Sequence, residues 1–231
     1  MATKTKFSPG SRRATGVAIL AAARAVDTRL IKGRLAAFEK VQRDYIAAQS
    51  DVENEDARLR AAQTRVGECD AAQDEAVESL ARALVADGQP RANPFASFGT
   101  PAPSSLGKLP PADEAKAIHR LVATVQRNKT ISKATLQAAQ AADKAAKAVE
   151  QALLPLDKLQ TALKTARHTR DAIGQSWESA LAALKRGARS AADDGAPQLY
   201  ATLFQTLAQP NSKSKKPAPQ PEPKSAPATS P

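Results

Sequence analysis

The sequence predicts an all-α fold: a long antiparallel helical hairpin or coiled coil, with a short third helix and a disordered basic, proline-rich tail. Large side chains recur at every seventh position from residue 31 to residue 80, and small residues, mostly Ala, follow three positions later. The composition agrees, because aromatic residues make up only 3% of the chain and leave little to fill a globular core.

The seven-residue repeat lies on one helix face and defines a predicted coiled-coil seam. Because Ala takes less room than Leu, the alternation of large and small residues would let a second helix approach closely. The single cysteine, Cys69, falls on the same face and is interpreted as a packing residue, not as a reactive thiol. The seam residues are Ile31, Phe38, Tyr45, Val52, Leu59, Ala62, Val66, Ala76 and Leu80.

The first long helix is predicted over residues 11–87, after a disordered basic N-terminus over residues 1–10. No proline falls between Pro9 and Pro90, and Gly88 suits a left-handed helix cap. Between residues 17 and 30 the seven-residue spacing gives way to a broader apolar face, which predicts contact with more than one neighbour.

A proline-rich connector is predicted over residues 88–111, and its prolines exclude a continuous helix there. Within it, Asn93-Pro94-Phe95 resembles the short peptide ligand of eukaryotic EH domains. The preferred interpretation is that Phe95 and Phe98 fold back over the end of the helices.

The second long helix is predicted over residues 112–194, with a kink at Pro155 and a weak point at residues 128–132. Asp113 and Glu114 would complement the positive end of its dipole. Two helices of similar length joined by a connector favour an antiparallel hairpin, with Asp87 beside Ala112.

The C-terminal part of the chain is predicted to hold a short amphipathic helix over residues 197–209. It would either cap the open end of the hairpin or bind a partner, and the cap is the preferred interpretation. Residues 210–231 are rich in Pro and Lys and are expected to be a disordered tail.

No catalytic, cofactor-binding or metal-binding residues can be assigned, so we expect a protein that is not an enzyme and needs no cofactor. The acidic groups at residues 53–56 and 70–75 are interpreted as solvated helix faces, and Trp177 as a packing residue. No targeting segment or membrane span is recognisable, which predicts a cytoplasmic protein.

Charge is distributed unevenly along the chain. Residues 1–50 carry a net +7 and residues 51–88 a net −6, so the sign of the charge reverses within the first predicted helix. Folding the hairpin would bring the basic segments of both helices to one open end, where an anion such as a nucleic acid could bind. The candidate anion-binding residues are Arg12, Arg13, Arg24, Arg29, Lys32, Arg34, Lys164, Arg167, Arg170, Lys185, Arg186 and Arg189.

Three functions compete for such a chain. The first is a non-enzymatic structural or scaffold protein that assembles with itself or with a larger complex. The alternative is a sequence-independent nucleic-acid-binding protein that uses the basic open end, and the second alternative is a membrane-surface binder of the BAR type. The expected partners are copies of the chain or a larger assembly, then nucleic acid, then a membrane surface, and no small-molecule substrate.

Overall fold

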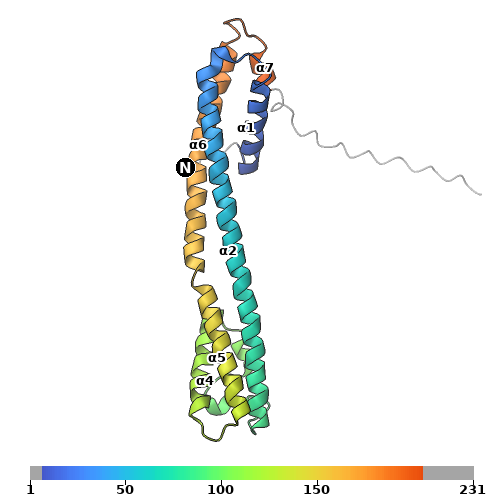
Figure 1. Cartoon of the computed structure of the whole chain (residues 1–231), viewed down its shortest axis with the longest axis vertical. Coiled ribbons are helices and arrows are strands. Elements are labelled where there is room, and N and C mark those ends of the chain that lie inside the picture. Colours follow the sequence, from blue (N-terminus) through green and yellow to red (C-terminus); the bar gives the residue numbers. More distant parts are fainter. Residues whose placement is uncertain (1–6, 205–231) are drawn as a thin grey trace, which may run out of the picture. The chain divides into compact units, whose positions relative to one another are not determined.

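The computed structural model describes residues 7–204 of the 231-residue chain. These residues form α-helices and short 3₁₀ helices with no strand among them, which confirms the all-α class. The chain divides into two compact units, here called unit 1 (Met1–Gln42 and Trp177–Pro231) and unit 2 (Arg43–Ser176). The two longest helices contribute to both units (Figure 1).

The described elements, in chain order, are seven α-helices and two 3₁₀ helices. They are α1 (Pro9–Ala23), η1 (Arg29–Ile31), α2 (Lys32–Ala86), η2 (Ala96–Phe98), α3 (Pro103–Leu106), α4 (Pro111–Arg127), α5 (Lys133–Leu153), α6 (Leu156–Ser190) and α7 (Leu199–Phe204).

The predicted helix over residues 11–87 is divided in two. It begins earlier than predicted, at Pro9, because the Ser8 side chain caps it by accepting from the Ser11 backbone N–H at 3.2 Å. It then stops at Ala23 and resumes through η1, where Asp27 accepts from the Arg29 backbone N–H at 3.0 Å. No Gly or Pro marks the break. Packing of the α1 apolar face within unit 1 therefore outweighs local helix propensity.

The C-terminal end of α2 follows the prediction. Gly88 has a positive φ of 91°, and the N–H groups of Gly88 and Gln89 donate to the carbonyls of Val85 and Leu84. These two bonds form a Schellman cap. The connector beyond it folds back as expected, because Phe95 and Phe98 are buried in the core of unit 2.

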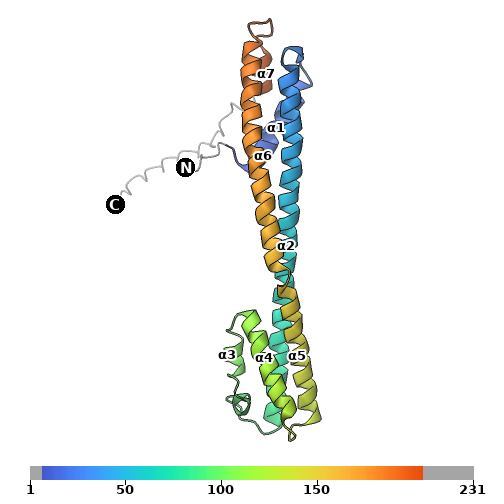
Figure 2. The same ribbon diagram turned by 90° about the vertical axis from the view of Figure 1, so that its left-hand side faces the viewer.

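The predicted second helix over residues 112–194 is also divided, and α4 folds back on α5 as an antiparallel pair (Figure 2). The reversal lies at the predicted weak point, residues 128–132. There the Asn128 carboxamide accepts from the Thr130 backbone N–H at 3.0 Å. Ser132 then caps α5 by accepting from the Thr135 N–H at 3.2 Å. These local hydrogen bonds favour a turn over a continuous helix.

The reversal changes the register of the hairpin. Asp87 lies beside Ser132, whose backbone N–H donates to it at 3.0 Å, and not beside Ala112 as predicted. Hydrogen bonds from Ser132 and Thr135 lower the pKa of Asp87. Further along unit 2, Arg167 reaches Asp56 at 3.4 Å, so α2 runs antiparallel to α5 and then α6. The interruption between α5 and α6 falls at Leu154–Pro155, the predicted kink.

The predicted seam packs as expected, because each of its residues is buried or half-buried. Cys69 is also buried, with a free thiol, as its position on the seam predicts. In unit 2 the C-terminal part of α2 forms one apolar cluster with α4, α5 and the connector. Ala139, Ala142 and Ala146 of α5 have no exposed surface there, so small side chains set the close approach.

The C-terminal helix α7 packs against α1 within unit 1, and Leu199, Leu203 and Phe204 are buried. This arrangement supports the cap interpretation for the described part of the segment predicted over residues 197–209. Residues 205–209, the predicted tail 210–231 and residues 1–6 lie outside the described residues. Among the helices of residues 7–204, none combines the length and the apolar character that crossing a membrane requires.

Candidate anion-binding surface

The helices of unit 1 are held by hydrogen bonds around one buried amide. The Trp177 Nε1–H of α6 donates to Gln42 Oε1 of α2 at 2.5 Å, and Gln42 Nε2 donates to the Arg13 carbonyl of α1 at 3.4 Å. Gly16 lies so close to the Gln42 amide that a Cβ at this position would overlap it. One side chain of α2 therefore fixes the positions of both α1 and α6 in unit 1.

Aromatic contacts surround this amide. Trp177 has no exposed surface, and its ring lies edge-on to Phe7 at a centroid distance of 5.4 Å and tilted against Phe38 at 5.6 Å. Such pairs add about 0.5–1.5 kcal/mol beyond the area that they bury. Trp177 is therefore a packing residue, as predicted, and offers no exposed ring for a base to stack on.

Arg12 is not available to an external anion, contrary to the sequence prediction. Its side chain is buried, with the residue 3% exposed, and its Nη2 donates to Glu178 Oε1 at 2.6 Å. A buried guanidinium requires a partner of opposite charge, since removing it from water is costly. Arg12 therefore joins α1 to α6 inside unit 1 and does not belong to the surface.

Four predicted residues of unit 1 are exposed and make no ion pair with residues 7–204. They are Arg13 and Arg24 at α1, Lys32 at the start of α2 and Arg186 on α6. Exposed guanidinium and ammonium groups keep their hydration in the unbound protein and can exchange it for phosphate oxygens. These four side chains are the candidate phosphate-binding residues of unit 1 and are called the exposed basic set below.

Two other predicted residues have contacts that hold them in place. Arg29 is bidentate on Asp27, with its Nη2 at 2.6 Å from Oδ2, and this pair lowers the pKa of the Asp27 carboxyl. The Arg34 side chain lies against Gly187, where an added Cβ would overlap the guanidinium. Arg29 is thus neutralised locally, whereas Arg34 keeps its charge on the surface.

The last two predicted residues of unit 1 lie over aromatic rings of α7. The Arg189 guanidinium is 4.6 Å from the Tyr200 ring centroid, and its Nη2 donates to the Tyr200 hydroxyl at 2.9 Å. Lys185 Nζ lies 5.4 Å from the Phe204 ring centroid. Cation–π contacts of this kind fasten α7 to α6 and leave the positive charges in place.

The remaining predicted residues, Lys164, Arg167 and Arg170, belong to unit 2. Arg167 pairs with Asp56, and Arg170 Nη2 lies 2.7 Å from Asp171 Oδ1. Lys164 is exposed. The candidate phosphate-binding residues described above therefore all belong to unit 1.

Nearly all of the net charge belongs to unit 1. It contains 16 Lys or Arg and 6 Asp or Glu, a net +10, whereas unit 2 contains 18 and 17, a net +1. Of the +10, a net +5 belongs to the described residues 7–42 and 177–204, and the rest lies in residues 1–6 and 205–231. The chain as a whole carries +11. An excess of one sign within one unit produces a field that attracts polyanions.

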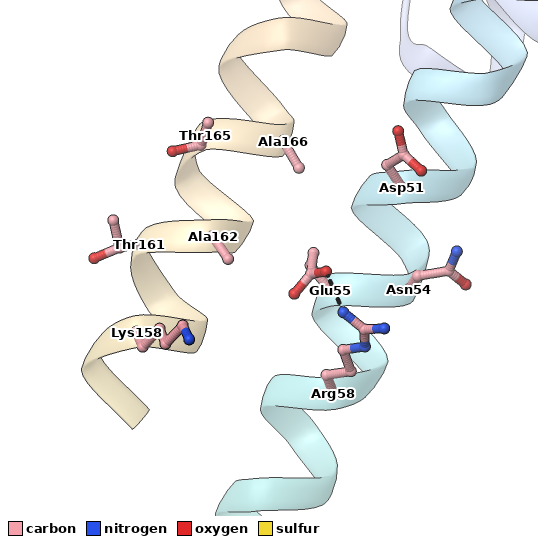
Figure 3. Close-up of a pocket in the computed structure, with 9 residues that line it drawn as sticks. All are labelled: Asp51, Asn54, Glu55, Arg58, Lys158, Thr161, Ala162, Thr165 and Ala166. Carbon is pink, nitrogen blue, oxygen red and sulfur yellow. Dashed lines mark hydrogen bonds and ion pairs between the residues drawn. The ribbon is translucent and has the colours of Figure 1, made fainter. Parts of the chain in front are cut away.

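Unit 2 contains a groove of about 630 Å³ between α2 and α6 (Figure 3). Ala162 and Ala166 point from α6 toward α2, and their small side chains leave this space open. On the α2 wall, Arg58 Nη1 donates to Glu55 Oε1 at 2.7 Å. The other charged residues of the lining are one acid and one base, so the groove has no net charge with which to select a ligand.

A second group of polar side chains in unit 2 surrounds His119 of α4. Its Nδ1 lies 2.7 Å from Asp143 Oδ1 and its Nε2 lies 3.4 Å from Glu150 Oε2, both on α5. The pKa of Asp143 is lowered, chiefly by its hydrogen bond with Lys147 and to a smaller extent by His119. Within residues 7–204, no three His, Cys, Asp or Glu side chains are grouped as a metal site requires. The geometry is that of a polar network in which His119 of α4 contacts two carboxylates of α5.

Sequence reasoning missed the residues that hold unit 1 together: Gly16, Gln42 and Glu178. The sequence could have indicated a structural role for one of these residues, Gln42. Gln42 stands four positions after Phe38 and three before Tyr45, so it falls on the apolar face where a polar residue needs a partner. Nothing in the sequence alone marks Trp177 and Arg13 as its partners.

The chain matches no protein-family model, no curated protein and no solved structure.

Proposed function

We propose that the chain is a non-enzymatic structural protein that attaches to nucleic acid through unit 1, by phosphate contacts that do not depend on base sequence. The observation that supports this proposal is the concentration of charge, a net +5 in the described residues of unit 1 (7–42 and 177–204) against +1 in unit 2. Lys and Arg side chains that neutralise phosphates release condensed counterions, and this term supplies most of non-specific binding.

The exposed basic set supplies the chemistry for such contacts. Arg13, Arg24, Lys32 and Arg186 are exposed on α1, α2 and α6 and are not neutralised by acids within residues 7–204. The aromatic rings of unit 1 are buried or covered, so base stacking, which typifies single-strand binding, has no platform here. A nucleic-acid duplex, recognised through its phosphates, fits this surface better than an unpaired strand.

The structural role is supported by the long helices, since α2 alone has 55 residues. Val17 and Leu30 of unit 1 remain 53% and 55% exposed, and nothing in the structure shows what covers them. Assembly with itself or with a larger complex therefore stays a prediction.

Duplex binding can be measured by fluorescence anisotropy with two labelled DNA duplexes of unrelated sequence. We expect equal affinity for both and a steep loss of affinity as salt rises from about 50 mM to about 200 mM. Reversing the exposed basic set (Arg13→Glu, Arg24→Glu, Lys32→Glu, Arg186→Glu) should abolish binding. In single reversals, each phosphate that the protein no longer neutralises should reduce the salt slope by about 0.9.

The matched control reverses four exposed bases of unit 2: Arg91→Glu, Arg120→Glu, Lys129→Glu and Lys144→Glu. It changes the net charge by the same amount and should keep its affinity within a few-fold. An equal fall in affinity in both variants would show that only the total charge matters. Preference for anionic vesicles over DNA would favour a membrane surface, and no binding to either at about 50 mM salt would refute the proposal.

A further inference from the structure

The first turn of α4 places an acid inside unit 2 with no base to neutralise it. Glu114 is 2% exposed and lies against α2, where Gln73 is 0% exposed and Asp70 is half-buried. Asp74, one turn along α2 from Asp70, is exposed. The sequence assigns Glu114 to the first turn of a helix, where it complements the dipole, and gives no reason for its burial.

Several polar atoms of this cluster lack hydrogen-bond partners among the described residues. They are Glu114 Oε1, both Gln73 side-chain atoms Oε1 and Nε2, and Asp70 Oδ1. Leaving a buried donor or acceptor unsatisfied costs about 1–3 kcal/mol, and more for a charged group. Gln73 lies near enough to Glu114 to act on its pKa, but the two side chains are not in good hydrogen-bond geometry with each other. The packing of the first turn of α4 on α2 therefore depends on the protonation state of this carboxyl.

The charges that face Glu114 are all negative. From α2 they are Asp70 and Asp74, and Glu78 acts in turn on Asp74. The bases of α4 and its approach are placed elsewhere: Lys116 pairs with Asp113, and Lys108 is exposed. His119, further along α4, is held by the acids of α5.

Burial raises the pKa of Glu114, and the nearby carboxylates of Asp74 and Asp70 raise it further. Gln73 opposes the rise, and so does the positive end of the α4 dipole. The pKa of Asp74 is raised as well, first because its carboxyl is partly removed from water although the residue is exposed, and then by Asp70 and Glu78. Geometry and electrostatics therefore both disfavour the ionised form of Glu114.

Either a metal cation or a proton could neutralise the cluster. A cation held by carboxylates would need several of them converging on one point. Among residues 7–204 no three Asp, Glu, His or Cys side chains are grouped in that way. A proton needs only one carboxyl and gives Glu114 an O–H that can donate to Gln73 Oε1.

We propose that Glu114 is a proton-operated latch between α4 and α2: the protonated carboxyl holds the first turn of α4 on α2, and the ionised carboxylate loosens it. The latch is independent of the nucleic-acid proposal, because it belongs to unit 2. The segment that it holds includes the end of the proline-rich connector, which enters α4 at Pro111.

The way in which stability depends on pH follows from the linkage between protonation of Glu114 and folding. The pKa of Glu114 in the folded protein lies above its ordinary value of 4.5, so the folded state binds this proton more tightly than the unfolded chain does. The stabilisation is fully present below pH 4.5 and is lost as pH rises through the folded-state pKa. Asp87 and Asp143 have lowered pKa values, so their opposite effect occurs below pH 3.8 and does not overlap.

Hydrogen exchange of the full-length chain tests the latch at α4 itself, with exchange rates corrected for their intrinsic pH dependence. As pH falls from about 7.5 to about 5, the opening of α4 in the wild type should decrease, by at most about tenfold per pH unit. Glu114→Gln mimics the protonated form, so its α4 should be better protected than the wild type at neutral pH, and its response to acid should be much smaller, with only the contribution of Asp74 left. The matched control Glu75→Gln, at an exposed acid of α2, should follow the wild type.

A second variant, Asp74→Asn, leaves the buried positions untouched and should weaken the response to acid by removing one of the neighbouring charges. Equal pH responses in the wild type and Glu114→Gln would overturn the proposal, and so would lower protection of α4 in Glu114→Gln at neutral pH. Millimolar calcium or magnesium that protects α4 in the wild type but not in Glu114→Gln would identify a cation, not a proton, as the neutralising species.

Discussion

Unit 1 and unit 2 hold their helices in different ways. In unit 1 the helix α1 is positioned by a few specific contacts: the Gln42 amide, the Trp177 ring and the ion pair between Arg12 and Glu178. In unit 2 an extended apolar cluster joins α2, α4, α5 and the connector. A few exacting contacts are more sensitive to a single substitution than a broad apolar cluster, in which neighbours can partly relax.

The two units also differ in their use of charge. The bases of unit 1 exceed its acids by ten, and several of them remain exposed. Unit 2 is nearly balanced, yet it buries one uncompensated acid, Glu114. Excess charge on a surface favours the binding of a partner of opposite charge. Excess charge in an interior favours the neutral form of the group or a change of conformation that exposes it. The functional proposals for the two units follow from this difference.

The largest effect should come from Trp177→Ala, because this ring contacts Phe38 and its N–H donates to Gln42. Truncating a buried aromatic side chain costs about 3–5 kcal/mol of the free energy of unfolding. Urea unfolding followed by far-ultraviolet circular dichroism gives the total destabilisation, and limited proteolysis should show cleavage at α1. A decrease below about 1 kcal/mol would mean that unit 1 does not depend on this contact.

A smaller effect is expected at the seam of unit 2. Ala76 is half-buried against the apolar cluster of unit 2, so replacing it by Leu should overpack the interface and cost about 1–3 kcal/mol. Ala62 is half-buried beside a groove of about 310 Å³, so Ala62→Leu should cost less than Ala76→Leu. Ala71→Leu, at an exposed position of the same helix, is the matched control and should change stability by less than about 0.5 kcal/mol. Thermal melts in which all three variants behave alike would place the seam on a different face.

The smallest effect distinguishes two glycines of α1. An added Cβ at Gly16 would overlap the Gln42 amide, which is hydrogen-bonded and buried, whereas one at Gly10 meets nothing within 4 Å. Gly16→Ala should therefore lower the free energy of unfolding by about 1–2 kcal/mol despite the better helix propensity of Ala. Gly10→Ala should leave it unchanged or slightly raised. If both variants stabilised the chain in urea unfolding, α1 would not be docked on Gln42.

Periodicity along the chain is sufficient to predict the all-α class, the seam, the Gly88 cap and the kink at Pro155, because each depends on residues close in sequence. The break after Ala23 and the reversal at residues 128–132 were not predicted as breaks. At Ala23 no Gly or Pro competes with helix, and at Ser132 the decisive acceptor, Asp87, lies 45 residues away. Tertiary contacts of this kind leave no local pattern to recognise.

The predicted anion-binding residues show the same limit. A count of basic residues makes Arg12 and Arg13 equally good candidates for anion binding. In the structure Arg12 is buried against Glu178, whereas Arg13 is exposed. Their difference depends on which face of α1 meets α6, and no composition count contains that information. Glu114 is the converse case, since an acid in a first helical turn gives no sign that the connector and α2 will bury it.

The buried Trp177 and the buried Cys69 provide each unit with its own spectroscopic reporter. Trp177 is the single tryptophan of the chain and belongs to unit 1, so intrinsic fluorescence excited at the indole band follows that unit alone. Cys69 is the single cysteine and belongs to unit 2, where its thiol is free and shielded. The rate at which a thiol reagent modifies it therefore counts the openings of unit 2. The wild-type chain, with no substitution or attached label, can thus show whether the two units unfold together or in sequence.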